Sequence, residues 1–148
     1  MADTEQAPKD LFGFLDFYLV KKAPFQIPDG GREFIVKYGP WIAIFFLVIS
    51  LPALLFILGV GTALMPFAGI GYSSSFGLAA ILLVVHLVLM VAALPGLFAR
   101  KMAGWRLLFY SEAISIVSSL ISGAIIGAIV GGLIGLYILF QVRSLYHE

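Results

Sequence analysis

Residues 105–146 read WRLLFYSEAISIVSSLISGAIIGAIVGGLIGLYILFQVRSLY, with no charged residue between Glu112 and Arg143. As one continuous helix this segment would be about 60 Å long, roughly twice the thickness of the hydrocarbon core of a bilayer. It must therefore fold back on itself, and Ser122-Gly123 at its midpoint is the expected turn. The segment predicts a helical hairpin embedded in a membrane.

Small residues recur along both halves of this hairpin at a helical spacing that places side chains on one face. The first half has serines and the second half glycines, namely Ser111, Ser115, Ser118 and Ser122, then Gly123, Gly127, Gly131 and Gly135. Small residues let helix backbones approach closely in lipid, where association depends on van der Waals fit. We therefore expect the serine face to pack on the glycine face. Ala128 and Gly132 add a second small face, which favours a homo-oligomer or a larger membrane complex.

The composition is that of a membrane protein. Of the 148 residues, 61% are hydrophobic and only 11% are charged, whereas about a quarter of the residues of a globular protein are charged. The bilayer is thus the expected partner. A net charge of +1 without a basic cluster argues against nucleic acid. The chain has no cysteine, which excludes disulfides, thiolate metal sites and cysteine nucleophiles.

Four runs match the thickness of a bilayer, at about residues 41–60, 76–94, 105–121 and 124–142. The expected fold class is an all-α integral membrane protein, a four-transmembrane-helix bundle with a tight hairpin between its third and fourth helices. Residues 97–106 are expected to form a basic interfacial loop between the second and third helices. Pro52, inside the first span, should bend that helix.

The first 37 residues are expected to form a cytoplasmic tail and an interfacial amphipathic helix, and residues 38–148 the membrane domain. One face of the helix expected near residues 10–22 carries the apolar residues Leu11, Leu15, Tyr18 and Leu19. Such a face suits a helix lying in the membrane interface. Binding to a protein partner through the same face would give the same pattern, so both interpretations stay open.

Basic residues determine the expected orientation, because short loops rich in Lys and Arg stay cytoplasmic. With four spans, all nine Lys and Arg residues lie on one side of the membrane. The opposite side, formed by residues 61–75 and the Ser122-Gly123 turn, has none. Both termini are therefore expected in the cytoplasm, with the chain in a plasma or inner membrane.

Glu112 and His86 are the polar residues inside the predicted spans that could carry chemistry. An intramembrane carboxylate is costly and marks a functional site by default. Glu112 lies about two turns past Arg106, so it could instead reach the headgroups or pair with an arginine. His86 would lie at mid-membrane, roughly 10 Å deeper than Glu112, which makes a direct pair doubtful. Ser115 and Ser119 could extend a polar path from Glu112.

No catalytic constellation can be assembled from one acid and one histidine, so neither an enzyme nor a metal or other cofactor is expected. The leading hypothesis is a non-enzymatic accessory, assembly or scaffold component that packs through its small-residue helix faces. The alternative is a small oligomeric proton-coupled transporter or channel that uses Glu112. The direction of the Glu112 side chain, into the bundle or out to the interface, discriminates between them.

Overall fold

The computed structural model describes residues 10–64, 66 and 70–148, most of which are helical; for residues 61–62 and 70–76 only the backbone is described. The all-α class is confirmed. The predicted N-terminal tail, residues 1–9, lies outside the described residues. The elements are, in order, α1 (Leu11–Asp16), η1 (Phe17–Lys21), α2 (Asp29–Phe56), η2 (Ile57–Gly61), α3 (Thr62–Leu64), α4 (Ile70–Phe98), α5 (Met102–Ile121), α6 (Ile125–Val142) and η4 (Arg143–Leu145).

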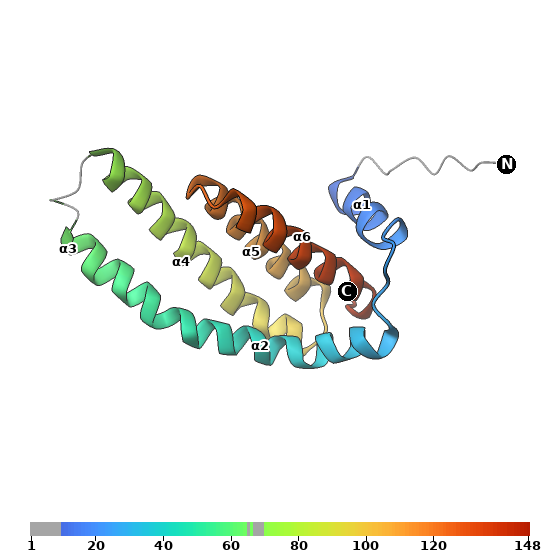
Figure 1. The fold of residues 1–148 in the computed structure, drawn as a ribbon. Helices are drawn as coiled ribbons and strands as arrows, with labels where there is room; N and C mark the ends of the chain where they lie inside the picture. The colour runs from blue at the N-terminus through green and yellow to red at the C-terminus, as the bar shows by residue number, and fades with distance from the viewer. Residues whose placement is uncertain (1–9, 65, 67–69) are drawn as a thin grey trace.

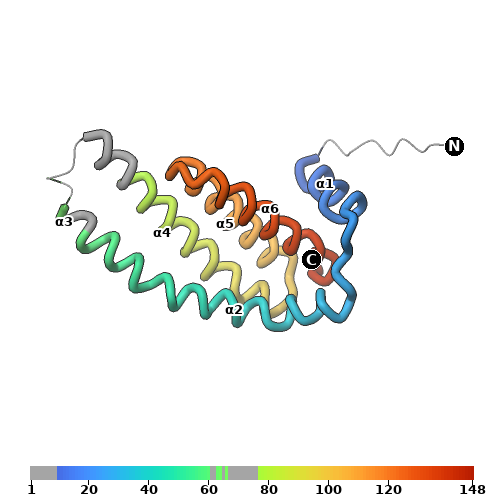
Figure 2. Tube along the Cα trace, in the orientation of Figure 1, coloured from blue at the N-terminus to red at the C-terminus, as the bar shows by residue number. Residues whose placement is uncertain are grey.

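Three helical segments are long and apolar enough to cross a membrane, over Asp29–Val60, Gly77–Phe98 and Ile125–Leu145. They correspond to the first, second and fourth predicted spans. Figures 1 and 2 show the long helix α2, α4 returning beside it, and the shorter α5 and α6 forming a second antiparallel pair next to α4. Large apolar side chains remain exposed on these helices, such as Leu55 at 69% and Ile126 at 80%, as expected of surfaces that lipid covers.

The first long helix begins earlier than predicted. It starts at Asp29, continues through Pro40 and Pro52 to Phe56, and is extended by the π-helical turn η2. Each proline removes one N–H from the helix, yet the helix continues on both sides of each. Figure 1 shows α2 as a curved helix, as internal prolines favour. The domain boundary expected at residue 38 falls inside this helix.

The loop predicted for residues 97–106 is much shorter in the structure, where it spans residues 99–101. The second long helix, α4, continues past Pro95 to Phe98, and α5 begins at Met102. A short turn connects them, with Arg100 at a φ of 53° and the Lys101 N–H donating to the Gly96 carbonyl over 2.8 Å. The turn can be this short because α4 and α5 touch at two glycines, Gly96 before the turn and Gly104 after it.

The turn predicted at Ser122-Gly123 is confirmed. The helix α5 ends at Ile121 and α6 begins at Ile125. Gly123 has a φ of +78°, its N–H donates to the Leu120 carbonyl over 3.1 Å, and the Ala124 N–H donates to the Ser119 carbonyl over 2.9 Å. This is the Schellman arrangement, in which a left-handed glycine satisfies the last carbonyls of a helix.

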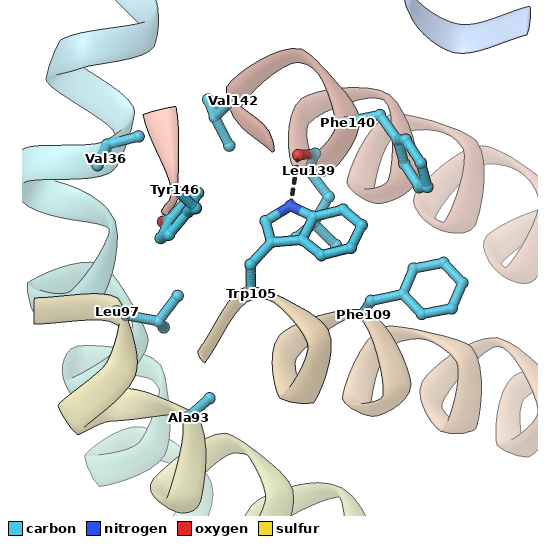
Figure 3. Packing of buried hydrophobic residues seen from close by; sticks show 9 residues of the cluster. All are labelled: Val36, Ala93, Leu97, Trp105, Phe109, Leu139, Phe140, Val142 and Tyr146. Carbon is cyan, nitrogen blue, oxygen red and sulfur yellow. Dashed lines mark hydrogen bonds between the residues drawn. The ribbon is translucent and has the colours of Figure 1, made fainter. Parts of the chain in front are cut away.

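The buried core gathers where α2, α4, α5 and α6 meet, and Figure 3 shows its members. Trp105 is almost fully buried, and its indole N–H donates to the Leu139 carbonyl over 2.8 Å. Around it lie the aromatic and aliphatic side chains of Val36, Ala93, Leu97, Phe109, Leu139, Phe140, Val142 and Tyr146. The hydrogen bond matters because a buried indole N–H without a partner would be costly.

The N-terminal arm, comprising α1, η1 and the linker that follows, docks on this core. Phe12 lies against the rings of Trp105 and Phe109, with centroids 5.9 and 5.0 Å away. Of the predicted apolar face, Leu15 and Leu19 pack on the core, whereas Leu11 and Tyr18 remain exposed. The arm therefore uses half of its apolar face within the chain.

The core lies at the end of the bundle that also holds the arginines, which we call the basic end. Here the start of α2, the α4–α5 turn and the end of α6 lie together (Figures 1 and 2). Three ion pairs connect these segments and the arm: Arg100 with Glu33, Arg106 with Glu148 at 3.1 Å, and Arg143 with Asp16 at 3.7 Å. The α5–α6 turn lies at the other end, called the far end.

Candidate functional site

The α5–α6 hairpin packs tightly, as predicted, and its register is defined by two close contacts. A methyl group added at Gly132 would lie 2.8 Å from a side-chain carbon of Ile116, and one added at Gly135 would meet the carboxyl group of Glu112. In antiparallel helices, a step forward along one helix corresponds to a step back along the other. Gly135 lies three residues after Gly132 and Glu112 lies four residues before Ile116, so both contacts belong to the same register. Glu112 therefore points across the seam onto the backbone of α6.

Glu112 shares a cavity of about 140 Å³ with two serines on its own helix, Ser115 and Ser119. On α6 the cavity is lined by Gly127 and Gly131, where an added methyl group would meet nothing within 4 Å. The space exists because these glycines have no side chains. A carboxylate and two hydroxyls thus line a small polar cavity beside α6.

Glu112 forms no hydrogen bond or ion pair with any residue that the structure describes. The arginines considered as partners are engaged elsewhere, Arg100 with Glu33, Arg106 with Glu148 and Arg143 with Asp16. A half-buried carboxylate in this setting costs free energy unless a proton or a cation neutralises it. The arrangement is therefore able to take up one or the other.

His86 on α4 lies next to this group and not at a different depth. Its Nδ1 is 2.8 Å from the hydroxyl oxygen of Ser111, the residue before Glu112. The expected difference of 10 Å in depth is wrong, because α4 extends to Phe98 and α5 starts at Met102. Counted from that turn at 1.5 Å per residue, His86 and Glu112 lie within about 3 Å of the same level.

The predicted row of serines on α5 faces two different helices, α4 and α6. Ser111 is buried against α4 through His86, whereas Ser115 and Ser119 face the cavity beside α6. The Ser122 hydroxyl donates a hydrogen bond to the Ser118 carbonyl over 2.8 Å, at the end of α5. The expectation of one serine face packed on α6 is therefore only partly met.

The four regularly spaced glycines were expected to form one packing face, but they have different roles in the structure. Gly123 serves the turn, Gly127 and Gly131 line open space, and only Gly135 is closely approached. Gly132, one position round the helix, makes the other close contact.

A close backbone contact that was not predicted joins α4 to α5. A methyl group added at Gly104 would lie 2.5 Å from the carbonyl carbon of Gly96, and one added at Gly96 would lie 2.6 Å from the Gly104 backbone. Two glycines eight residues apart on either side of a turn are the signal that could have revealed it. The Pro95-Gly96 pair instead suggested the end of a helix.

A second polar cavity, also not predicted, lies at the basic end. It measures about 400 Å³ and lies between the arm and the ends of α2, α5 and α6. Gln141, which is 1% exposed, forms part of its wall. Neither cavity holds a group of three or more metal-ligating side chains within the described part of the chain.

Comparisons of the chain with protein-family models, with curated proteins and with solved structures found no match.

Proposed function

We propose that this chain is a non-enzymatic four-span membrane protein that takes up a proton or small cation at Glu112 and acts as a small proton-coupled transporter or channel. The observation that carries the proposal is the direction of Glu112. Its carboxyl group points into the α5–α6 seam, in a cavity that it shares with Ser115 and Ser119. A side chain reaching out to the headgroups would instead have supported a purely structural role.

The fourth span in this proposal is α5. Its 20 residues would cover about 30 Å, the thickness of the hydrocarbon core. It is less apolar than its neighbours because it carries Arg106, Glu112 and several serines. It packs between α4 and α6, antiparallel to both (Figure 1), so it traverses the same layer as they do.

The basic end faces the cytoplasm in this proposal, with both termini on that side. Support comes from Arg100, Arg106 and Arg143, which belong to different segments and yet form ion pairs at one end of the bundle. Short basic segments stay on the cytoplasmic side of membranes. The far-end turn at Ser122-Gly123 has no charged residue.

The polar path runs from Glu112 toward the far end. Ser115 is one turn beyond Glu112 and Ser119 two turns beyond it, so the hydroxyls extend the path by about 10 Å. In the opposite direction the aromatic core around Trp105 and Phe109 closes the bundle. Glu112 would therefore exchange its proton or cation with the far side, and passage to the basic end would require the core to move.

His86 supports the same site from α4. Its hydrogen bond with Ser111 fixes the turn of α5 that presents Glu112 to α6. We assign His86 a positioning role, because its Nδ1 is already engaged by Ser111.

The test is proton flux into liposomes that contain the purified chain, driven by a potassium diffusion potential and read with an internal pH dye. Glu112→Gln should abolish the flux, and Ser119→Ala should reduce it. The matched control is Glu148→Gln, which removes an exposed carboxylate paired with Arg106 at the basic end and should leave flux unchanged. Proton transport is excluded if the native chain passes no protons, and the role of Glu112 is excluded if Glu112→Gln passes them as well as the native chain.

A second candidate function is that of an accessory or assembly component. It is favoured by the unfilled small-residue surface at Gly127 and Gly131, which no side chain of the described chain occupies. A neighbouring helix could pack there. Gly131→Leu would fill this surface and should dissolve an oligomer or larger complex, measured as particle mass in detergent, whereas Gly39→Leu on α2 serves as the control. A monomer without partners would exclude this candidate.

A further inference from the structure

The polar cavity at the basic end is built from segments far apart in sequence. Its 400 Å³ lie between the arm, the first turn of α2, the start of α5 and the end of α6. The polar side chains that line it are Asp16, Gln26, Arg32, Gln141, Arg143 and Ser144. Apolar side chains, among them Val20, Met102 and Phe140, complete the wall.

Gln141 holds this cavity together. Its amide nitrogen donates to the Leu19 carbonyl over 3.0 Å, and its amide oxygen accepts from Arg32 over 2.8 Å and from the Ile27 N–H over 3.4 Å. A nearly fully buried amide whose donor and acceptor are both used ties the arm and α2 to α6. The cavity is therefore a feature of the folded chain and not a gap between loose segments.

Arg32 brings a guanidinium group with spare hydrogen-bonding capacity into this cavity. One terminal nitrogen is shared between Gln26 and Gln141, at 2.8 Å from each amide oxygen. Its Nε is buried without a hydrogen-bond partner among the described residues. The nearest carboxylate, that of the fully exposed Asp29, is 4.0 Å away. Because Nε has almost no accessible surface and one terminal nitrogen is already used by two amides, the second terminal nitrogen, whose ion pair with Asp29 is long, is the one left for an anion in the cavity.

Arg143 faces the same cavity from the end of α6. Its guanidinium group lies over the rings of Phe12, Trp105 and Phe140, between 5.2 and 5.9 Å from their centroids. Its ion pair with Asp16 is long, at 3.7 Å. Since a guanidinium group has five N–H donors, most of those of Arg143 have no acceptor within the part of the chain that the structure describes.

We propose that this cavity binds a phosphate group, supplied by the headgroup of an anionic lipid in the leaflet at the basic end. Two guanidinium groups and one carboxylate give the lining a net charge of +1, which matches a phosphodiester. Arginine binds phosphate oxygens in a bidentate manner. The cavity lies at the end of the Ile125–Leu145 membrane segment, at the level where headgroups lie, and its apolar wall can take the first part of an acyl chain. Basic pockets between membrane helices on this side commonly hold anionic headgroups.

The experiment uses Trp105 as the reporter, because the guanidinium group of Arg143, which lines the cavity, lies over its ring. The full chain carrying Trp41→Phe, which leaves Trp105 as the only tryptophan, is titrated in detergent with short-chain phosphatidylglycerol. Parallel titrations use short-chain phosphatidylcholine and inorganic phosphate. Native mass spectrometry counts retained lipid independently of fluorescence.

Phosphatidylglycerol should quench or shift the Trp105 emission saturably, and phosphatidylcholine should bind more weakly. Arg32→Gln and Arg143→Gln should each weaken phosphatidylglycerol binding about fivefold. Arg143→Lys should retain part of the affinity, which separates loss of charge from loss of fold. Arg106→Gln, an exposed arginine outside the cavity, should bind as the native chain does.

Competition by inorganic phosphate at comparable concentration would support the phosphate site but assign it to a soluble ligand. Equal binding of both lipids, or equal lipid retention by Arg143→Gln and Arg106→Gln, would overturn the proposal.

Discussion

The contact between Gly96 and Gly104 offers a sharp test of how the bundle is assembled. In Gly104→Ala the new methyl group would lie 2.5 Å from the Gly96 carbonyl carbon and from the Leu97 nitrogen, whereas ordinary contacts are 3.4–4 Å. These are backbone atoms, so no rotamer change can relieve the overlap. The two helices must move apart by about 1 Å, and overpacking of this kind costs about 1–3 kcal/mol.

Gly104→Ala should therefore lower the free energy of unfolding by about 2 kcal/mol, measured by sodium dodecyl sulfate titration in a mild detergent with far-UV circular dichroism. The matched control is Gly131→Ala, where the methyl group meets nothing within 4 Å; it should stay within about 0.5 kcal/mol of the native chain. Adding Gly96→Ala to Gly104→Ala should cost less than the sum, because one separation relieves both overlaps. If Gly104→Ala is as stable as Gly131→Ala, α4 and α5 do not meet through their backbones.

Two other predictions concern hydrogen bonds that join the helices. Gln141→Leu removes the bonds to Leu19 and Ile27 that hold the arm, so cleavage by trypsin after the exposed Lys22 should become about tenfold faster; an unchanged rate would mean that the arm is held by other contacts. A double-mutant cycle between His86→Ala and Ser111→Ala should give a coupling of about 0.6 kcal/mol in the same unfolding assay, the average for such bonds in membranes. Additive effects would contradict their pairing.

Local sequence signals were enough for the parts of the fold that depend on neighbouring residues. The α5–α6 turn needs a residue at positive φ, and Gly123 is the residue that can adopt it without strain. The three most apolar helices follow from length and hydropathy alone. The meeting of Arg100, Arg106 and Arg143 at one end of the bundle agrees with the number of long helices that separate them along the chain.

Contacts between segments could not be read in the same way. Serines at a common spacing lie on one side of α5, but Ser111 and Glu112 differ by about 100° in direction, so one faces α4 and the other α6. Which neighbour each meets depends on how α4 and α6 sit around α5. The Pro95-Gly96 pair ends helices in water, whereas here Gly96 permits the crossing with Gly104.

The cavity at the basic end was beyond sequence reasoning for the same reason. Gln141 bonds to Leu19, Ile27 and Arg32, all more than 100 residues away along the chain. A single glutamine at the end of an apolar helix carries no local sign of such partners.

The site as a whole depends on the register between α5 and α6, and a disulfide can test that register directly because the native chain has no cysteine. A methyl carbon at position 132 would lie 2.8 Å from the Cγ1 atom of Ile116, close to the distance of about 3 Å between a Cβ and the far sulfur of a disulfide. Ile116→Cys with Gly132→Cys should therefore form an intramolecular disulfide rapidly under mild oxidation. The exposed neighbour, Val117→Cys with Gly132→Cys, should not. If Val117→Cys with Gly132→Cys forms the disulfide and Ile116→Cys with Gly132→Cys does not, Glu112 lies outside the α5–α6 seam and the proposed site is wrong.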